Sequence, residues 1–176
     1  MRTHIHTINR TCLHAIREQS LAGLDKDNKI DFGLDEKTIG TIKQFSDKNI
    51  ERFANQCVLL LSLSLYDLNR IVEKALFSTS SFPSFKNNNI YINHALSIYI
   101  STLHELCSTN PKQASLRFGV SKELAEQLTQ IPLDKLLSAM SQLNFNMRPK
   151  KGVCQYLTGE SNSLSRARRI IASYTH

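Results

Sequence analysis

Six basic side chains gather near the C-terminal end of the sequence, and their type suggests contact with an anionic partner. The cluster comprises Arg148, Lys150, Lys151, Arg166, Arg168 and Arg169. Within residues 148–169, Glu160 is the only acidic residue. Because lysine and arginine neutralise phosphates, this local excess of positive charge suggests a nucleic acid. A solvated tail that keeps the protein soluble is the alternative, and charge alone leaves both interpretations open.

A polar segment between the two parts of this cluster offers hydrogen-bonding groups to DNA. We expect Ser163 to cap a final helix over residues 164–174, where free main-chain N–H groups favour phosphate. Asn162 is the best candidate for reading a base, because an amide can pair with adenine in the major groove. The predicted DNA-binding residues are therefore Lys150, Lys151, Ser161, Asn162, Ser163, Arg166, Arg168 and Arg169.

Catalytic and metal-binding patterns are not evident in the sequence. No two of the four cysteines form a CxxC pair, whereas zinc sites use clustered cysteine and histidine ligands. The six glycines form no phosphate-binding or dinucleotide-binding pattern. Five of the six histidines lie on predicted helices without a serine or cysteine signature, so we expect satisfied histidines rather than catalytic bases. They are His4, His6, His14, His94 and His104. We therefore expect no enzyme activity, no metal site and no cofactor.

The net charge of +7 is unevenly distributed. Residues 1–89 contain 12 basic and 10 acidic residues, and residues 90–176 contain 10 basic and 5 acidic residues. The longest apolar run, over residues 58–65, is far shorter than the roughly 20 residues that a transmembrane helix needs. The first residues also lack the apolar block of a signal peptide. We therefore expect a cytoplasmic protein without membrane contact.

Apolar spacing predicts a mostly helical chain. The nearly continuous apolar run over residues 58–65 predicts a buried strand. The apolar face of residues 91–109 is wider than a surface helix needs, which favours burial between two units or in a dimer. Helices are expected over residues 4–21, 34–44, 47–56, 66–77 and 91–109.

Residues 113–148 predict three short helices followed by an extended tail. Gly119 suits the end of the first helix, Ser121 the cap of the second, and Pro132 the first turn of the third. Alternating apolar and polar residues over 143–148 predict a strand. The short apolar piece 153–157 is interpreted as a further strand. The helix–turn–helix pattern is a weaker DNA reader than the later polar loop, because its second helix exposes a nearly neutral face.

Residues 32–63 repeat the pattern of residues 118–149 at a constant offset of 86 residues, without a gap. Phe32–Gly33 falls on Phe118–Gly119, and Ile50 falls on Leu136. Identities are few, but the apolar register is kept across two helices and a strand. A repeat of this length is too long for a solenoid unit and indicates a duplicated small domain. The alternative is that two unrelated helix–turn–helix segments share the pattern.

A composition change divides the chain into two units. Residues 78–89 are rich in serine and asparagine and contain a proline, so they are the best candidate for a linker. We therefore predict a first unit over residues 1–77, a linker over 78–89, and a second unit over 90–176 that carries the basic C-terminal loop and helix.

The second unit shows a specific order of features. They are a long first helix, an alanine-rich turn at 114–119, helices around 123–130 and 133–142, a strand from 142, and the loop Leu157-Thr158-Gly159-Glu160-Ser161. In this order and spacing, residues 90–172 resemble the D subunit of the flagellar master transcriptional activator. In that family the loop after a Leu–Thr motif approaches DNA, and it corresponds here to Ser161, Asn162 and Ser163. The chain departs from the family by its additional first unit, and by Asn144 and Phe145 where the family has a cysteine.

The resemblance implies an all-α DNA-binding regulator that dimerises, joins a zinc-containing C subunit and activates transcription. Together with the repeat, it predicts a mostly α fold of two tandem D-like units, each with a short strand, that form an intrachain pseudo-dimer. The helix over 91–109 would then pack against its counterpart over 4–21.

We therefore expect the DNA-binding subunit of a heteromeric bacterial activator that works with RNA polymerase. Because related D–C activators occur on conjugative elements, conjugative-transfer genes are one candidate set of targets. Only the second unit is expected to keep the DNA-facing loop. The alternative is an adaptor that dimerises and stabilises the zinc-binding C-type partner without touching DNA.

Overall fold

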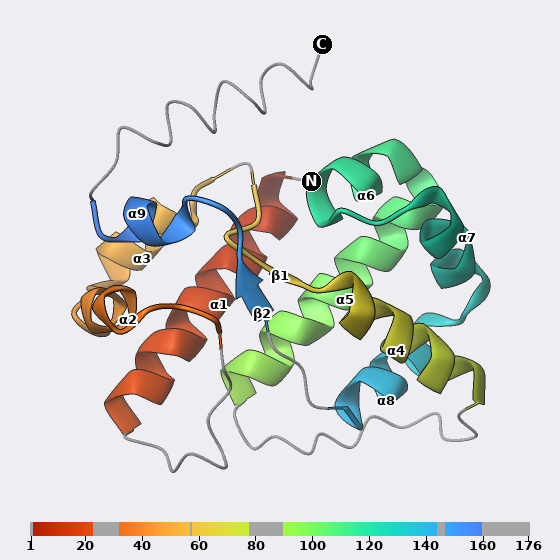
Figure 1. Ribbon diagram of the computed structural model, residues 1–176, viewed down its shortest axis with the longest axis horizontal. Coiled ribbons are helices and arrows are strands. Elements are labelled where there is room, and N and C mark those ends of the chain that lie inside the picture. Colours follow the sequence, from red (N-terminus) through yellow and green to blue (C-terminus); the bar gives the residue numbers. More distant parts are fainter. Residues whose placement is uncertain (1, 23–31, 57, 78–89, 144–146, 160–176) are drawn as a thin grey trace.

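A computed structural model describes residues 2–22, 32–56, 58–77, 90–143 and 147–159 of the chain. These residues form a mostly helical fold with a small antiparallel sheet, as the apolar spacing predicts (Figure 1). None of the helices within the described ranges is long and apolar enough to cross a membrane. The elements are α1 (Arg2–Ala22), α2 (Glu36–Lys43), α3 (Asp47–Ala54), β1 (Leu61–Leu63), α4 (Leu65–Phe77), α5 (Ile90–Thr109), α6 (Pro111–Phe118), α7 (Lys122–Gln130), α8 (Leu133–Ser141), β2 (Met147–Pro149) and α9 (Val153–Leu157).

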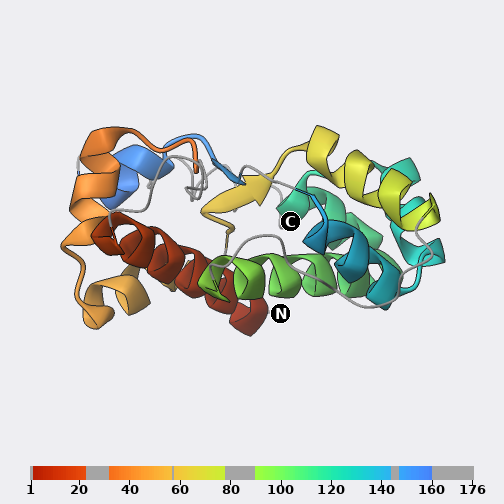
Figure 2. The ribbon, with the colours of Figure 1, turned by 90° about the horizontal axis from the view of Figure 1, so that it is seen from below.

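The two longest helices, α1 and α5, pack against each other. Figure 2 shows them along one side of the molecule, with the sheet and the shorter helices α2, α4, α8 and α9 on the other. This contact confirms the prediction that the wide apolar face of residues 91–109 packs against the first helix. The hydroxyl of Tyr99 on α5 is fully buried, and this burial raises the pKa of Tyr99.

The strands β1 and β2 pair in antiparallel fashion at the centre of the molecule. Leu61 lies opposite Pro149, Ser62 opposite Arg148, and Leu63 opposite Met147. The strand β1 is shorter than the predicted strand over residues 58–65, because Val58 and Leu60 form hydrogen bonds with the side chain of Asn9. Residues 144–146 of the second predicted strand lie outside the described residues. One short strand in each half of the described chain agrees with the predicted mostly α fold.

Several predicted helix boundaries are present. The main-chain N–H of Leu124 donates to the side chain of Ser121 at 3.2 Å, so Ser121 caps α7 as predicted. Gly119 ends α6 with a φ of 75°, a left-handed conformation that glycine adopts without a steric penalty. Pro132 lies at the N-cap of α8, one residue before the first turn in which it is expected.

The prediction of a strand over residues 153–157 is wrong. These residues form the one-turn helix α9, which begins after Gly152, whose φ is 82°. Val153 and Leu157 are buried, and residues four positions apart lie on the same face of a helix. A five-residue apolar piece carries too little periodicity to separate a strand from a helix, and packing against α2 decides the outcome.

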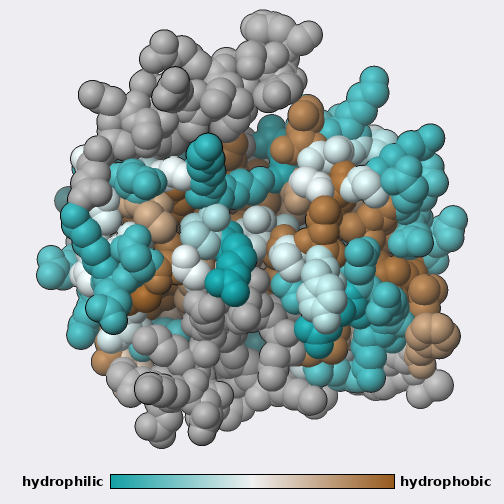
Figure 3. All heavy atoms as spheres, in the orientation of Figure 1, coloured by the Kyte–Doolittle hydropathy of each residue, from teal (hydrophilic) through white to brown (hydrophobic). Residues whose placement is uncertain are grey.

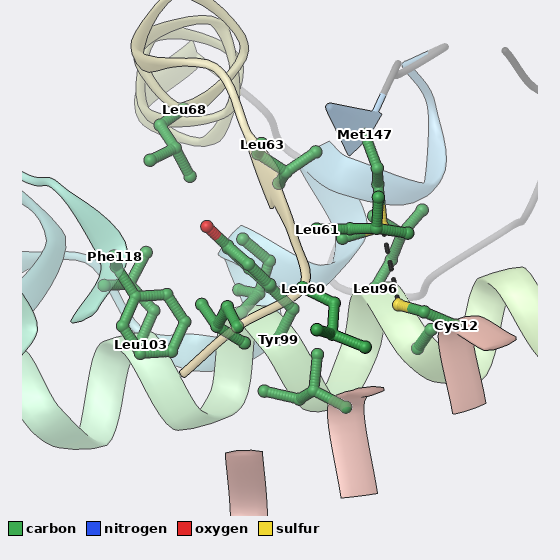
Figure 4. Close-up of a cluster of buried hydrophobic side chains, with 14 of the residues drawn as sticks. Cys12, Leu60, Leu61, Leu63, Leu68, Leu96, Tyr99, Leu103, Phe118 and Met147 are labelled. Atoms are coloured by element: carbon green, nitrogen blue, oxygen red, sulfur yellow. Dashed lines mark hydrogen bonds between the residues drawn. The ribbon is translucent and has the colours of Figure 1, made fainter. Parts of the chain in front are cut away.

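One continuous hydrophobic core extends through both predicted units. The helix α4 packs against α7 and α8, whereas α9 packs against α2. Figure 4 shows the centre of this core, where Leu61 of β1 and Met147 of β2 lie near Cys12 of α1. The Cys12 thiol donates to the Met147 sulfur at 3.8 Å, and burial raises the pKa of Cys12 to about 12.

The element bounds follow the 86-residue offset found in the sequence. The helices α2 and α7 begin at this offset, as do α3 and α8, and β1 and β2 agree at both ends. Ser62 and Arg148, the central pair of the ladder, are themselves 86 residues apart. The buried faces of α1 and α5 match at an offset of 87, as with Ile5 and Ile92. The correspondence therefore includes the first helix of each half.

Asn9 is a buried polar residue that holds the segment leading into β1. Its side-chain N–H groups donate to the carbonyl oxygens of Val58 at 2.8 Å and Ala54 at 3.3 Å. The main-chain N–H of Leu60 in turn donates to Asn9 Oδ1 at 2.9 Å. Because Asn9 is only 1% exposed, its removal would leave main-chain groups buried without a partner.

The first prediction concerns this network. We expect Asn9→Ala to lower the free energy of unfolding by about 2–4 kcal/mol, since buried main-chain groups lose their hydrogen bonds. Urea denaturation monitored by circular dichroism measures the change. Gln127→Ala, at an exposed position on α7, is the control and should change the free energy by less than about 0.5 kcal/mol. Equal effects of the two substitutions would contradict the role assigned to Asn9.

Candidate nucleic-acid interface

The outer face of the two-stranded sheet is polar and basic. Side chains alternate between the two faces of a strand, so Leu61, Leu63 and Met147 point into the core and are buried. Ser62 and Arg148 lie opposite each other on the other face, and Arg148 is exposed. Figure 3 shows hydrophilic atoms in the middle of the face on which the sheet lies in Figure 1. We name Arg148, Lys150 and Lys151 the β2 basic cluster.

Arg148 lies against the turn that precedes α2. A Cβ atom placed on Gly33 would be 2.8 Å from Arg148 Nη1 and 3.0 Å from its Cδ. Gly33 has a φ of 61°, so glycine serves both the conformation and the close approach of the arginine. Gly119, at the corresponding position in the second half, has a φ of 75° but open space beside it. By the same correspondence, the strand residue that would lie beside Gly119 is Ser62, whose side chain is short.

Lys150, a predicted DNA contact, also makes a contact within the protein. Its Nζ donates to the carbonyl oxygen of Arg117 at 2.6 Å, in the last turn of α6. A helix C-terminus carries partial negative charge, which favours a cation at this point. Burial lowers the pKa of Lys150. The ammonium group is therefore directed at the end of α6, and a contact between Lys150 and DNA remains a prediction.

Lys151 is exposed at the start of the turn between β2 and α9. The helix α9 is fixed by Tyr156, whose ring meets that of Phe53 edge-on at a centroid distance of 5.1 Å. Gln56 donates its side-chain N–H to the Tyr156 hydroxyl. This docking on α3 and α2 holds the whole β2–α9 turn in place.

The Leu–Thr motif forms the end of α9. Leu157 is buried, and the main-chain N–H of Thr158 donates to the carbonyl oxygen of Cys154 at 3.0 Å. The Thr158 hydroxyl donates to the same oxygen at 3.0 Å. Gly159 follows with a φ of 75°. The motif therefore sets the point from which the predicted DNA-facing loop begins.

The remaining predicted DNA contacts lie outside the described residues. Lys150 and Lys151 alone are placed, and the structure brings them beside Arg148, which sequence reasoning counted in the charge cluster but did not assign to DNA. The signal for Arg148 is present in the sequence: positions 148 and 150 share one face of an extended strand, and both are basic. The predicted residues beyond the structure are Ser161, Asn162, Ser163, Arg166, Arg168 and Arg169.

His6 on α1 and His104 on α5 each have a polar partner within the protein. His104 Nε2 lies 3.1 Å from the carbonyl oxygen of Ile131, and His6 Nε2 lies 3.0 Å from Glu51 Oε2. Within the described ranges, no group of three or more histidine, cysteine, aspartate or glutamate side chains is placed to hold a metal ion.

The chain matches no protein-family model, no curated protein and no solved structure. Its function is therefore inferred from its own residues and contacts.

The second prediction uses the lowered pKa of Lys150. Because the unfolded lysine binds its proton more tightly, the charged form opposes folding below the lowered pKa of the folded state. This cost disappears as pH rises from that pKa to the ordinary lysine pKa of 10.5. Stability attributable to Lys150 should therefore increase from pH 8 toward pH 10.5. The measurement is the difference in unfolding free energy between wild type and Lys150→Met, which cancels other titrations. A difference that is constant or falls over this range would contradict the assignment.

Proposed function

We propose that the chain is a DNA-binding subunit of a heteromeric transcriptional activator of the D–C type. The observation that carries this proposal is the β2 basic cluster, on the outer face of the sheet and on the turn that follows it. Beyond α9, the sequence continues into Arg166, Arg168 and Arg169. Placed on one duplex, these groups would neutralise successive phosphates, and Asn162 would be positioned to read a base.

A central position for the basic cluster suits contact with a duplex. The cluster is held by well-packed elements: Arg148 lies in the ladder, and α9 docks on α2 and α3. Cations on a rigid support lose little conformational freedom when they meet phosphates, which favours binding. Lys151 and Arg148 are exposed in the free protein, so their contact with DNA needs no opening of the fold.

We further propose that the two halves are copies of one D-like unit, packed as an intrachain pseudo-dimer. Three observations support this. Equivalent elements share their bounds at an offset of 86 residues. The ladder is centred on two equivalent residues, Ser62 and Arg148, as a twofold axis through it would require. The pairs α4 with α7 and α9 with α2 are equivalent contacts exchanged between the halves.

The proposed partner is a zinc-containing C-type subunit, and the complex would act with RNA polymerase on bacterial operons, conjugative-transfer genes among the candidates. This part rests on the resemblance of residues 90–172 to the flagellar D subunit. The second candidate function is an adaptor that stabilises the C-type partner without touching DNA. The Lys150–Arg117 contact favours it to a limited extent, because that cation already has a partner within the protein.

The third prediction separates these two functions. Charge reversal by Arg166→Glu, Arg168→Glu and Arg169→Glu should weaken binding to a labelled double-stranded DNA fragment at least about tenfold and reduce the salt dependence by about 0.9 per lost phosphate contact. A gel shift of the complex co-expressed with the C-type partner measures both effects.

Lys43→Glu with Lys48→Glu is the control for this experiment, because both lysines are exposed on the first half. We expect the control to change DNA affinity less than the arginine variant. An unchanged shift in the arginine variant would support the adaptor, and equal losses in both would contradict the asymmetry between the halves.

The fourth prediction tests the pseudo-dimer. A protease site inserted within residues 78–89 allows the folded chain to be cut between its halves. The two pieces should remain associated on size-exclusion chromatography, because α1 packs on α5 and because α4 and α9 each pack on the other half. Separation of the pieces under native conditions would refute the exchanged packing.

A further inference from the structure

Helix α4 carries apolar side chains on two faces, and only the inner face packs against the other described elements of the chain. Its inner face is buried against α7 and α8. Its outer face carries large apolar side chains at both ends. The exposed fractions of these side chains are 50% for Leu65, 71% for Tyr66, 60% for Leu76 and 84% for Phe77. Figure 3 shows hydrophobic atoms toward the two ends of α4, with hydrophilic atoms between them.

We propose that this outer face binds the same face of a second copy of the chain, with the two α4 helices antiparallel. At 100° per residue, Leu65, Tyr66, Asn69, Glu73, Leu76 and Phe77 fall within a stripe about 120° wide, and the apolar pairs are three full turns apart. A stripe of this width and straightness is the form of a helix–helix contact surface.

The sequence of this stripe is self-complementary in the antiparallel orientation. A twofold axis beside Ile71 places each residue opposite the one equally far on the other side of that position. Leu65 then faces Phe77 of the second copy, and Tyr66 faces Leu76. At each end of the stripe, an aromatic ring of one copy therefore packs against a leucine of the other, and this contact buries apolar surface on both copies.

The polar centre of the stripe is matched in the same register. Asn69 falls opposite Glu73 of the second copy, so an amide N–H can donate to a carboxylate on each side of the axis. Both side chains belong to exposed residues in the single chain. This match argues for a second copy rather than an unrelated protein, because every position of the stripe finds a suitable partner in itself.

The second half of the chain does not repeat the apolar start of this stripe. At the 86-residue offset, Leu65 and Tyr66 correspond to Lys151 and Gly152. This comparison rests on the proposed duplication, whereas the exposure of the α4 stripe does not.

The size of the face sets the expected strength of association. The exposed portions of the four apolar side chains amount to roughly 500 Å² per copy, or roughly 1,000 Å² for two copies. This is the lower limit for a specific interface, so we expect a dissociation constant in the micromolar range.

Sedimentation equilibrium of the full-length protein, from about 1 µM to about 1 mM, tests the proposal. Wild type should pass from monomer to dimer, and Tyr66→Ser with Phe77→Ser should raise the dissociation constant at least about tenfold. Leu116→Ser is the matched control, because Leu116 is 52% exposed on α6, and it should leave the constant unchanged. Circular dichroism should show all variants folded, since each altered side chain is exposed.

A rescue experiment tests the register. Asn69→Asp should weaken the dimer by setting a carboxylate against Glu73, and adding Glu73→Gln should restore it. Absence of rescue would overturn the antiparallel pairing. A wild-type protein that stays monomeric throughout, or a Tyr66/Phe77 variant that dimerises as wild type does, would overturn the proposal and leave another protein as the occupant. Neither result affects the arginine and cleavage experiments on the proposed function.

Discussion

Neither half of this protein buries its apolar residues without the other, and the rest of the structure depends on that constraint. The helix α4 leaves the first half to cover α7 and α8, and α9 leaves the second half to cover α2. The strands β1 and β2 meet where these two connections cross. A three-residue ladder is too short to be stable alone. It persists because Leu61, Leu63 and Met147 are buried in the core on its inner face.

This repeated scaffold carries different chemistry in its two halves. At the centre of the ladder, Ser62 lies opposite Arg148. The Arg148 side chain occupies the space beside Gly33, whereas the space beside the corresponding Gly119 is open. Ser64 follows β1, and its hydroxyl donates to the carboxylate of Asp67 at the start of α4. At the 86-residue offset, the residue that corresponds to Ser64 is Lys150. In the duplication that we propose, each surface is free to diverge, because surface residues contribute little to packing. In our proposals, one half contacts phosphate and the other contacts protein.

Much of the helical framework could be predicted from the sequence. Spacing of apolar residues located the helices, and Ser121 and Gly119 marked boundaries that depend on neighbouring residues only. The length of β1 and the helical structure of residues 153–157 could not be predicted. The first depends on hydrogen bonds to the distant Asn9, and the second on packing against α2 and on the contact of Tyr156 with Phe53. For the candidate site, the sequence indicated the basic residues but gave no sign that Lys150 reaches the end of α6.

The sequence by itself determined the periodicity, the 86-residue register and the concentration of positive charge, because each is a property of residue order. Tertiary structure decided which surfaces these residues share. It placed Arg148 against Gly33 and left one face of α4 exposed. It also joined the two halves, because α4 of the first half packs on α7 and α8, and α9 of the second half packs on α2. These features arise from contacts between residues far apart in the chain, where the free energy of burial selects among arrangements that local sequence leaves equivalent.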